Sequence, residues 1–212
     1  MGKRHFGSPF NSDDPFIGDN KSNTITGDDA NNEIVGKQGS DTLHGGLGDD
    51  DIKGDQGKDS LFGDDGNDTL NGGNGKDVLD GGNDDDTLIG GNGKDVLMGG
   101  AGADTLTGGR GADTFVFADT TGVPDTITDF KSHVDKIAID FVPGAAETLT
   151  ADDFFLATDL SGLTPGHEAL IYDKATGVLS YDADGAGGAD PVEVVHLTPG
   201  TELTKDDLSF LS

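Results

Sequence analysis

The sequence predicts an all-β protein, built as a parallel β-roll of nine-residue repeats that is followed by a mixed, β-rich C-terminal cap. Three observations support this prediction. Glycine begins a nine-residue unit at every ninth position from Gly18 to Gly108, which makes eleven units. The eighth residue of each unit is apolar, from Ile25 to Phe115, and the sixth is Asn or Asp throughout. A fixed period held by three columns is typical of a repeat architecture.

Each unit is expected to contain a turn and a short strand. Glycines at the first, second and fourth positions permit the positive φ that tight turns need. The last three residues, such as 69–71, are expected to form a strand whose middle side chain points inward. Two units make one coil, and stacked coils pair each strand in parallel with the strand 18 residues later.

The charge of the chain is difficult to reconcile with such a stack. The formal net charge is −28, hydrophobic residues are 32% of the sequence, and only five of the 41 acidic residues are Glu. Low hydrophobicity with high charge is typical of disorder, but Asp is favoured in turns and where hard cations need oxygen ligands. The sixth-position carboxylates form columns of like charge, which the 13 Lys and Arg are too few to neutralise. We therefore expect a cation from outside the chain between the coils.

Calcium is the cation that these residues favour. It takes about six to eight oxygen ligands, and glycine-rich turns offer many backbone carbonyls. Zinc is excluded because Cys is absent and the His residues are scattered, and magnesium is a weaker candidate because it keeps its waters. The expected side-chain ligands are Asp41, Asp50, Asp59, Asp68, Asp77, Asp86, Asp95, Asp104 and Asp113, together with Asn23 and Asn32 in the first two units.

The acidic balance also excludes several partners. Nucleic acid and anionic membrane surfaces both need Lys and Arg. No apolar run approaches the roughly 18 residues of a membrane span, so membrane insertion is not expected. The first ten residues lack the apolar run of a cleavable secretory signal.

The units GGNGKDVLD (72–80) and GGAGADTLT (99–107) resemble those of the repeats-in-toxin (RTX) family of secreted bacterial proteins. The resemblance implies a right-handed roll with calcium in the turns between unit n and unit n+2. It implies seven sites with two carboxylates, from Asp41/Asp59 to Asp95/Asp113, whereas the pairs that begin at an Asn offer only one. Carbonyls of the first four positions would complete each shell, and the glycines expected there are Gly46, Gly48, Gly57, Gly66, Gly73, Gly75, Gly82, Gly91, Gly93, Gly100 and Gly102.

From residue 117 the nine-residue register stops. Residues 125–130 and 136–139 alternate as strands, and residues 170–181 predict a hairpin. Thr150 and Thr204, each followed by acidic residues, predict two helix starts.

The C-terminal region also resembles a known one. Segments 112–117, 125–130 and 181–185 are similar to the region that follows the repeats in serralysin-type proteases. The resemblance implies type I secretion with an uncleaved C-terminal signal. The predicted organisation is an N-terminal cap or disordered lead (1–17), the roll (18–116), and a capping and secretion region (117–212).

Three local features resemble functional motifs or depart from the repeat, and each has a structural explanation. Residues 167–171 begin like a zinc-protease helix, but Ile171 stands where the second His is required. Residues 182–193 imitate an EF-hand loop, but Ala186 occupies a ligand position and strands flank the loop, so a structural turn is favoured over an extra calcium site. Asp84 replaces the fourth-position glycine of its unit, where we expect a weakened turn.

The sequence thus predicts a secreted, extracellular protein without enzymatic activity, folded by about seven or more calcium ions. Two functional classes stay open. One is binding of acidic extracellular polysaccharide by calcium bridging, which similarity to modules of alginate epimerases implies. The other is a non-catalytic secretion or structural module, related to the C-terminal domains of serralysin proteases or alginate epimerases. An enzyme, as in the serralysins, comes third, because the sequence lacks a protease segment beside the repeats.

Overall fold

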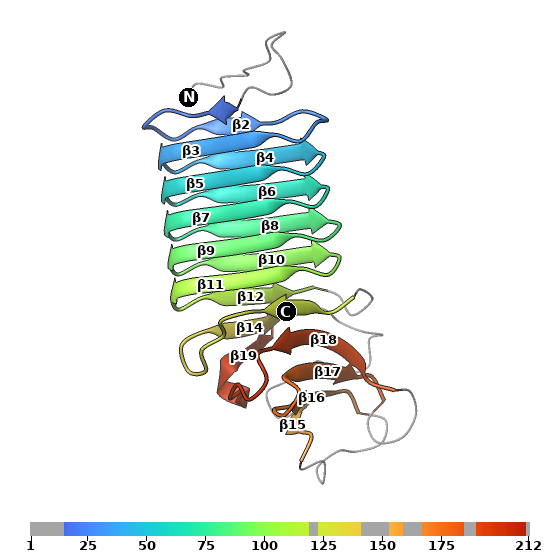
Figure 1. The fold of residues 1–212 in the computed structure, drawn as a ribbon. Coiled ribbons are helices and arrows are strands. Elements are labelled where there is room, and N and C mark those ends of the chain that lie inside the picture. The colour runs from blue at the N-terminus through green and yellow to red at the C-terminus, as the bar shows by residue number, and fades with distance from the viewer. Residues whose placement is uncertain (1–14, 119–122, 141–152, 159–166, 185–189, 211–212) are drawn as a thin grey trace.

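The computed structural model describes residues 15–118, 123–140, 153–158, 167–184 and 190–210. Two sheets face each other along a flattened column of stacked coils, and further strands lie below the last coil (Figure 1). In the roll, odd-numbered strands belong to one sheet and even-numbered strands to the other. The predicted all-β parallel roll is confirmed.

The first sheet has eleven strands. In spatial order they are β1 (Phe16–Ile17), β3 (Glu33–Gly39), β5 (Asp51–Gly57), β7 (Thr69–Gly75), β9 (Thr87–Gly93), β11 (Thr105–Gly111), β13 (Asp125–Ile127), β18 (Val192–Leu197), β17 (Val178–Asp182), β16 (Ala169–Asp173) and β15 (Phe154–Leu156). The second sheet has eight strands. In spatial order they are β19 (Leu208–Phe210), β14 (Lys136–Ile139), β12 (Thr114–Phe117), β10 (Val96–Ala101), β8 (Val78–Asn83), β6 (Ser60–Asp65), β4 (Thr42–Leu47) and β2 (Thr24–Thr26).

Neighbouring coils pair in parallel with a register of 18 residues. Leu70 pairs with Leu88 in the first sheet, and Leu79 pairs with Leu97 in the second. Because this part of the roll has no insertion, each repeat position lies beside the same position of the next coil on that sheet. The columns of the sequence are therefore columns in space.

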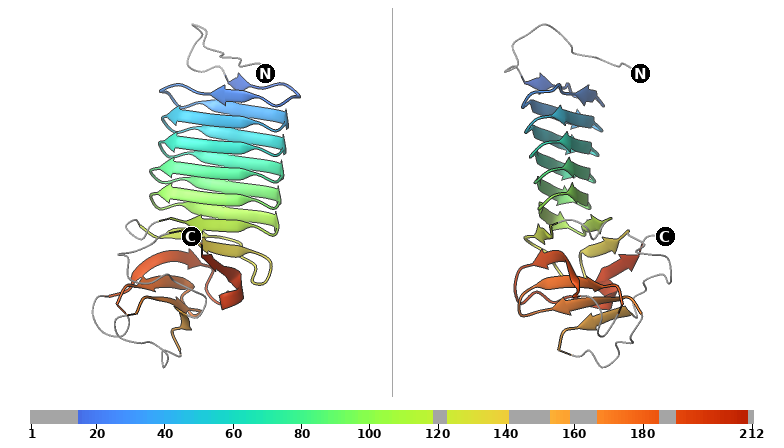
Figure 2. Two further views of the ribbon diagram at one scale, coloured as in Figure 1. Left: turned by 180° about the vertical axis from the view of Figure 1, so that it is seen from behind. Right: turned by 90° about the vertical axis from the view of Figure 1, so that its right-hand side faces the viewer.

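The eighth-position side chains form the interior of the roll. All of them from Ile34 to Phe115 are fully buried, and Ile25 in the first coil is 7% exposed. Each strand of the repeats contributes one such side chain to a thin layer between the sheets. The edge-on view shows how the two sheets face each other along the roll (Figure 2). Because this core is small, the charge between the coils has a large influence on stability.

The roll extends beyond the nine-residue register at both ends. At its start Phe16 pairs with Ile34, so part of the segment predicted as a cap or lead is a strand of the roll. At its end β11 pairs with β13 and β12 pairs with β14, still in parallel. These last pairings have offsets of 21 and 22 residues, and short insertions therefore hide this coil from a nine-residue search.

The C-terminal strands extend both sheets across the end of the roll. β18 pairs in parallel with β13, and β19 pairs in parallel with β14. The predicted hairpin is confirmed, since β16 and β17 are antiparallel with Leu170 opposite Tyr181. The strands predicted within 125–130 and at 136–139 are confirmed as β13 and β14.

Neither predicted helix start leads to an α-helix in the described residues. At Thr204 the Asp207 carboxylate accepts a hydrogen bond from the backbone N–H of Thr204 at 2.9 Å, but only the three-residue 3-10 helix η2 (Lys205–Asp207) follows. It ends there because β19 pairs with β14. Residues 150–152 lie outside the described ranges, and the chain after them forms strand β15 from Phe154. The described part of the chain has no helix long and apolar enough to cross a membrane.

Candidate metal-binding turns

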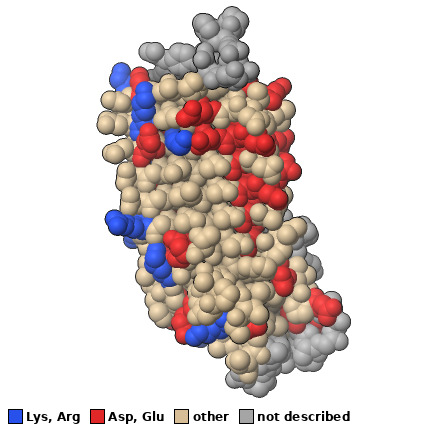
Figure 3. All heavy atoms as spheres, in the orientation of Figure 1, with Lys and Arg blue, Asp and Glu red and all other residues tan. Residues whose placement is uncertain are grey.

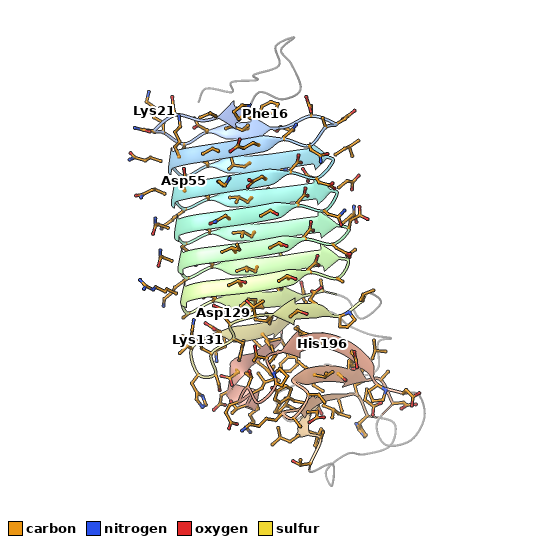
Figure 4. The ribbon with its side chains drawn as sticks, viewed as in Figure 1. Phe16, Lys21, Asp55, Asp129, Lys131 and His196 are labelled. Atoms are coloured by element: carbon orange, nitrogen blue, oxygen red, sulfur yellow. The ribbon has the colours of Figure 1, made fainter. Side chains whose placement is uncertain are left out.

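The turns of the roll gather on two edges, where the chain passes between the sheets. The first edge carries the turns at residues 18–23, 36–41, 54–59, 72–77, 90–95 and 108–113. The second edge carries the turns at residues 27–32, 45–50, 63–68, 81–86 and 99–104. Lys21 and Asp55 mark the first edge in Figure 4. Each turn ends in a sixth-position residue, so the predicted side-chain ligands form one column on each edge.

The sixth-position Asp residues bind the backbone of the preceding coil. Oδ1 of Asp59 accepts a hydrogen bond from the backbone N–H of Asp41 at 2.8 Å, and Oδ1 of Asp77 accepts one from Asp59 at 2.9 Å. On the second edge, Oδ1 of Asp68 accepts one from Asp50 at 2.7 Å. All nine predicted Asp residues make this bond, with donor–acceptor distances from 2.6 to 3.0 Å.

The second oxygen of each carboxylate is buried and has no hydrogen-bond partner. This holds for Oδ2 of Asp41, Asp50, Asp59, Asp68, Asp77, Asp86, Asp95, Asp104 and Asp113. These residues are at most 3% exposed. A buried carboxylate oxygen that is neither paired nor hydrogen-bonded costs about 1–3 kcal/mol or more. Such oxygens, arranged in two columns, are what a bound cation would satisfy.

A backbone carbonyl lies close to these unpaired oxygens. A Cβ added at Gly45 would lie 2.1 Å from Oδ2 of Asp50 and 2.6 Å from the carbonyl oxygen of Gly63 in the next coil. A Cβ added at Gly81 would likewise lie 2.3 Å from Oδ2 of Asp86. Only glycine leaves this space open. Carboxylate and carbonyl oxygens from successive coils therefore converge beside the first-position glycines.

The glycines predicted to offer carbonyls all lie in these turns. Positive φ angles occur at Gly46, Gly48, Gly57, Gly66, Gly73, Gly75, Gly82, Gly91, Gly100 and Gly102, and Gly93 is the exception. At Gly57, where φ is 154°, an added Cβ would lie 1.5 Å from the carbonyl oxygen of Gly39, so a larger residue does not fit. Asp84 adopts a φ of 75° at its glycine position, and Gly82 still pairs with Gly100, so the ladder continues past it.

Burial changes the protonation of the carboxylates. Desolvation raises the pKa of Asp50, Asp59, Asp68 and Asp95 to about 6 and the pKa of Asp86 to about 8. The N–H that each Oδ1 accepts opposes this rise, and neighbouring carboxylates add to it. The charged form is therefore unfavourable in the fold until a cation neutralises it.

The atoms of the turns that could coordinate a cation are oxygen atoms. Among the described residues, no three Asp, Glu, His or Cys side chains converge on one point, so a cation here needs backbone carbonyls as well. A mixed shell of carboxylate and carbonyl oxygens suits calcium, whereas zinc prefers nitrogen and sulfur. The residues of the turns fit the cation expected from the sequence.

The family model of the RTX calcium-binding nonapeptide repeat (4 copies) matches residues 10–43, 17–52, 26–61, 44–79, 53–88 and 80–115. The matches together span residues 10–115, which is half of the chain. The chain belongs to this RTX family. Its nonapeptide repeats bind calcium, as the composition of the turns predicts.

Two solved structures are similar to this RTX chain at low identity. The extracellular lipase LipA from Serratia marcescens has 17% identity and a TM-score of 0.33, and the match covers 94% of this chain and 40% of the lipase. The AlgE6R3 subunit of the Azotobacter vinelandii mannuronan C5-epimerase has 19% identity and a TM-score of 0.22, and the match covers 96% of this chain and 86% of that one. The chain thus spans less than half of the lipase. The search of curated proteins finds no match.

The first two turns of the RTX roll differ from the rest. Oδ1 of Asn32 accepts a hydrogen bond from the backbone N–H of Asp28 at 2.8 Å, and its Nδ2 donates to the Asp28 carboxylate at 3.1 Å. Asn23 makes the same two contacts with Asp19. These amides close their own turns by hydrogen bonds. Asn23 and Asn32 therefore continue the columns without adding a buried charge.

Two further Asp residues, which the nine-residue register missed, extend the columns into the cap. Oδ1 of Asp125 accepts a hydrogen bond from the N–H of Asp104 at 3.0 Å, and Oδ1 of Asp135 accepts one from Asp113 at 3.1 Å. Both are at most 7% exposed. A signal for Asp125 exists in the sequence, because Asp-Thr-Ile-Thr at 125–128 repeats the pattern of Asp-Thr-Leu-Thr at 104–107.

Beyond the repeat turns of the first edge, the segment between β13 and β14 contains a cation from the protein itself. Nζ of Lys131 donates a hydrogen bond to the carbonyl oxygen of Gly109 and lies 3.7 Å from the Asp129 carboxylate. That carboxylate accepts the N–H groups of Gly108 and Gly109 at 2.9 and 2.8 Å. Asp135 accepts the N–H of Lys131 with its Oδ2 at 2.8 Å. Asp129 and Lys131 lie on this edge below the repeats (Figure 4).

The zinc-protease-like and EF-hand-like motifs of the sequence lie next to strands in the described residues. His167 precedes strand β16, so the zinc-protease helix does not form. In the EF-hand-like segment, Asp182 ends strand β17, and its Oδ1 accepts the backbone N–H of Asp184 at 3.2 Å, as in a local turn. The rest of that loop, at 185–189, lies outside the described residues.

Proposed function

We propose that this protein is a secreted calcium-binding module whose roll folds when calcium binds between successive coils. The observation that carries the proposal is the two columns of buried Oδ2 atoms that have no hydrogen-bond partner. When bound, calcium supplies the positive charge that these desolvated carboxylates need. No side chain of the described repeats can supply that charge, because their Lys and Arg side chains are at most half-buried and the columns are buried.

Each site would be held by two sixth-position carboxylates of successive coils on one edge, with carbonyl oxygens of the turn glycines. The pairs are Asp41/Asp59, Asp50/Asp68, Asp59/Asp77, Asp68/Asp86, Asp77/Asp95, Asp86/Asp104 and Asp95/Asp113. Asp104 with Asp125 would add one more on the second edge. At the next pair, Asp113 and Asp135, the ammonium of Lys131 binds the carbonyl of Gly109 and would compete with a metal for it.

Because such sites bind calcium weakly, folding depends on the calcium concentration of the compartment. Extracellular calcium sites have dissociation constants near 10⁻⁴ M, so about 1 mM calcium adds roughly 1.4 kcal/mol per site, or about 10 kcal/mol over seven sites. At about 1 μM calcium the same sites add almost nothing. The chain would stay unfolded inside the cell and fold outside it, which suits one-step type I secretion.

The folding part of the proposal is tested by circular dichroism during calcium titration of the chelated chain. We expect disordered spectra in chelator and a cooperative gain of β signal with calcium, and a weaker response to magnesium. A full β signal in chelator at neutral pH would contradict the proposal. Export is tested separately, by comparing secretion of the full chain and of a chain that ends at residue 116 through a type I apparatus.

Outside the cell, the first candidate role is binding of acidic polysaccharide. The exposed, flat strands and the oxygen-rich turns provide a polar surface on which calcium could bridge two carboxylates. The alternative is a purely structural module, for which calcium serves folding and export alone. Binding of the calcium-loaded protein to a panel of acidic glycans separates the two, because no binding in calcium leaves the structural role.

A further inference from the structure

Among the turns of the repeats, positive charge is confined to one edge. The six turns of the first edge contain six Lys and Arg residues, namely Lys21, Lys37, Lys58, Lys76, Lys94 and Arg110. The five turns of the second edge contain none. Beyond the sixth-position column, the second edge contains Asp28, Asp29, Asp49, Asp64, Asp65, Asp84 and Asp85, against only Asp19 and Asp55 on the first edge. Figure 3 shows this division between blue and red atoms.

Three of these cations form a regular row. Lys58, Lys76 and Lys94 each occupy the fifth position of a turn, and the pairing of β5, β7 and β9 aligns these turns in register. Neighbouring strands of a sheet lie about 4.8 Å apart, so the three side chains start at this interval along the roll. All three are exposed, and Arg110 is exposed in the last turn of the same edge.

The row does not stabilise the fold through charge pairing within the described chain. No ion pair found in the described residues involves the row, whereas Lys53, Lys131 and Lys174 each take part in one. Like charges one strand apart repel each other. Water and salt screen these exposed charges, which leaves them available to a partner outside the chain.

We propose that the row Lys58–Lys76–Lys94, continued by Arg110, is a binding track for a linear carboxylated polyanion, such as a chain of uronic acids. Lysine is a compact point charge on a flexible stem, which suits single carboxylates spaced along a polymer. The acidic second edge repels the same polymer, so binding is directed to one edge. The proposal rests on the proposed function only in that calcium must fold the roll. It differs in the contact, which is lysine and not bridging calcium.

The test uses the full chain, loaded with calcium, and a linear oligogalacturonate long enough to span the row. The triple variant K58Q/K76Q/K94Q removes three positive charges from the track and leaves every predicted calcium ligand in place. The matched control K53Q/K174Q/K205Q removes three positive charges elsewhere. Affinity is measured by calorimetry at two salt concentrations, and folding of each variant is verified by calcium-dependent circular dichroism.

We expect the wild type and the control to bind with affinities that fall with salt, and the track variant to bind about tenfold more weakly, as three exposed ion pairs predict. Equal affinity of the track variant and the wild type, with binding still lost in chelator, would overturn the track and leave calcium bridging as the contact. An equal loss in the control would also overturn it, because net charge would then be the cause. A wild type that binds no oligogalacturonate would overturn it as well.

A second copy of the chain is the other possible occupant of the row. Its acidic edge has the same spacing as the track, so sedimentation of the wild type without glycan separates the two cases. We expect a monomer at all concentrations. Self-association that disappears in K58Q/K76Q/K94Q would overturn the polysaccharide assignment, because the partner of the row would then be another roll.

Discussion

Oδ1 of Asp59 accepts the backbone N–H of Asp41 at 2.8 Å, while Oδ2 of the same carboxylate is buried without a hydrogen-bond partner. The two oxygens of one side chain therefore have different roles. One aligns successive coils by a hydrogen bond, and the other presents a charge that the protein does not neutralise. Repeated along both edges, this arrangement couples the stacking of coils to the binding of a cation.

Replacing Asp77 by Asn is expected to have opposite effects with and without calcium. In about 1 mM calcium the change removes one carboxylate from two sites, so the free energy of unfolding should fall by about 3 kcal/mol. In chelator it should rise, because a buried charge disappears while the amide oxygen can still accept the N–H of Asp59. Urea unfolding measures the loss in calcium, and the β signal of circular dichroism in chelator measures the gain.

The exposed Asp65 provides the control for that experiment, since D65N changes the net charge equally and leaves the columns intact. It should shift stability by less than about 0.5 kcal/mol in either buffer. A loss of stability for D77N in chelator would contradict a cation-dependent role for this carboxylate.

Acidification is expected to stabilise the calcium-free chain. The folded pKa is raised from 3.8 to about 6 for Asp50, Asp59, Asp68 and Asp95, and to about 8 for Asp86. A raised folded pKa contributes stability that is present below the unfolded pKa and is lost as pH rises through the folded pKa. Stability without calcium should therefore increase as pH falls from about 8 to about 4.

Circular dichroism of the chelated chain between pH 7.5 and pH 5 checks this expectation through a gain of β signal. Calcium affinity should change in the other direction and weaken over the same range, because protons compete for the same oxygens. A chelated chain that loses β signal on acidification would show that the buried carboxylates are not the groups that limit folding.

Replacing Gly57 by Ala is expected to disrupt the roll locally. The new Cβ would lie 1.5 Å from the carbonyl oxygen of Gly39, so the two coils must separate. We expect a loss of about 3 kcal/mol or more in calcium, measured by thermal unfolding. Gly200→Ala is the matched control, because Gly200 also has positive φ but has open space around it, and should cost only about 1 kcal/mol. Equal costs would mean that backbone strain, and not the close approach of coils, makes Gly57 necessary.

Replacing Lys131 by Met tests whether this residue takes the place of a metal at the end of the first column. Because its side chain is about half exposed, the loss of stability should stay near or below 1 kcal/mol. The more specific result is the number of bound calcium ions counted by native mass spectrometry, which should rise by one once the ammonium is gone. Lys174→Met removes a lysine from a surface ion pair with Glu202 and should leave the count unchanged. A count that stays the same in both variants would exclude this role for Lys131.

Much of this arrangement can be predicted from the sequence because the repeat is local and regular. The apolar eighth position, the Asp of the sixth and the glycines of the turn each follow from the needs of one nine-residue unit. The hairpin around Asp173–Gly177 could be predicted for the same reason. The prediction of a helix after Thr204 was wrong, because pairing of β19 with β14 ends it after one turn.

The sequence by itself determined the stacked coils, the oxygen-only turns and the need for an external cation, since these depend on period and composition. Tertiary structure alone decided that Asp135 continues the first column and that Lys131 binds a turn carbonyl at the end of that column. Strand pairing tolerates the short insertions that precede these residues, whereas a linear period does not. The strands still pair in parallel register across these insertions, although the nine-residue repeat of the sequence has ended.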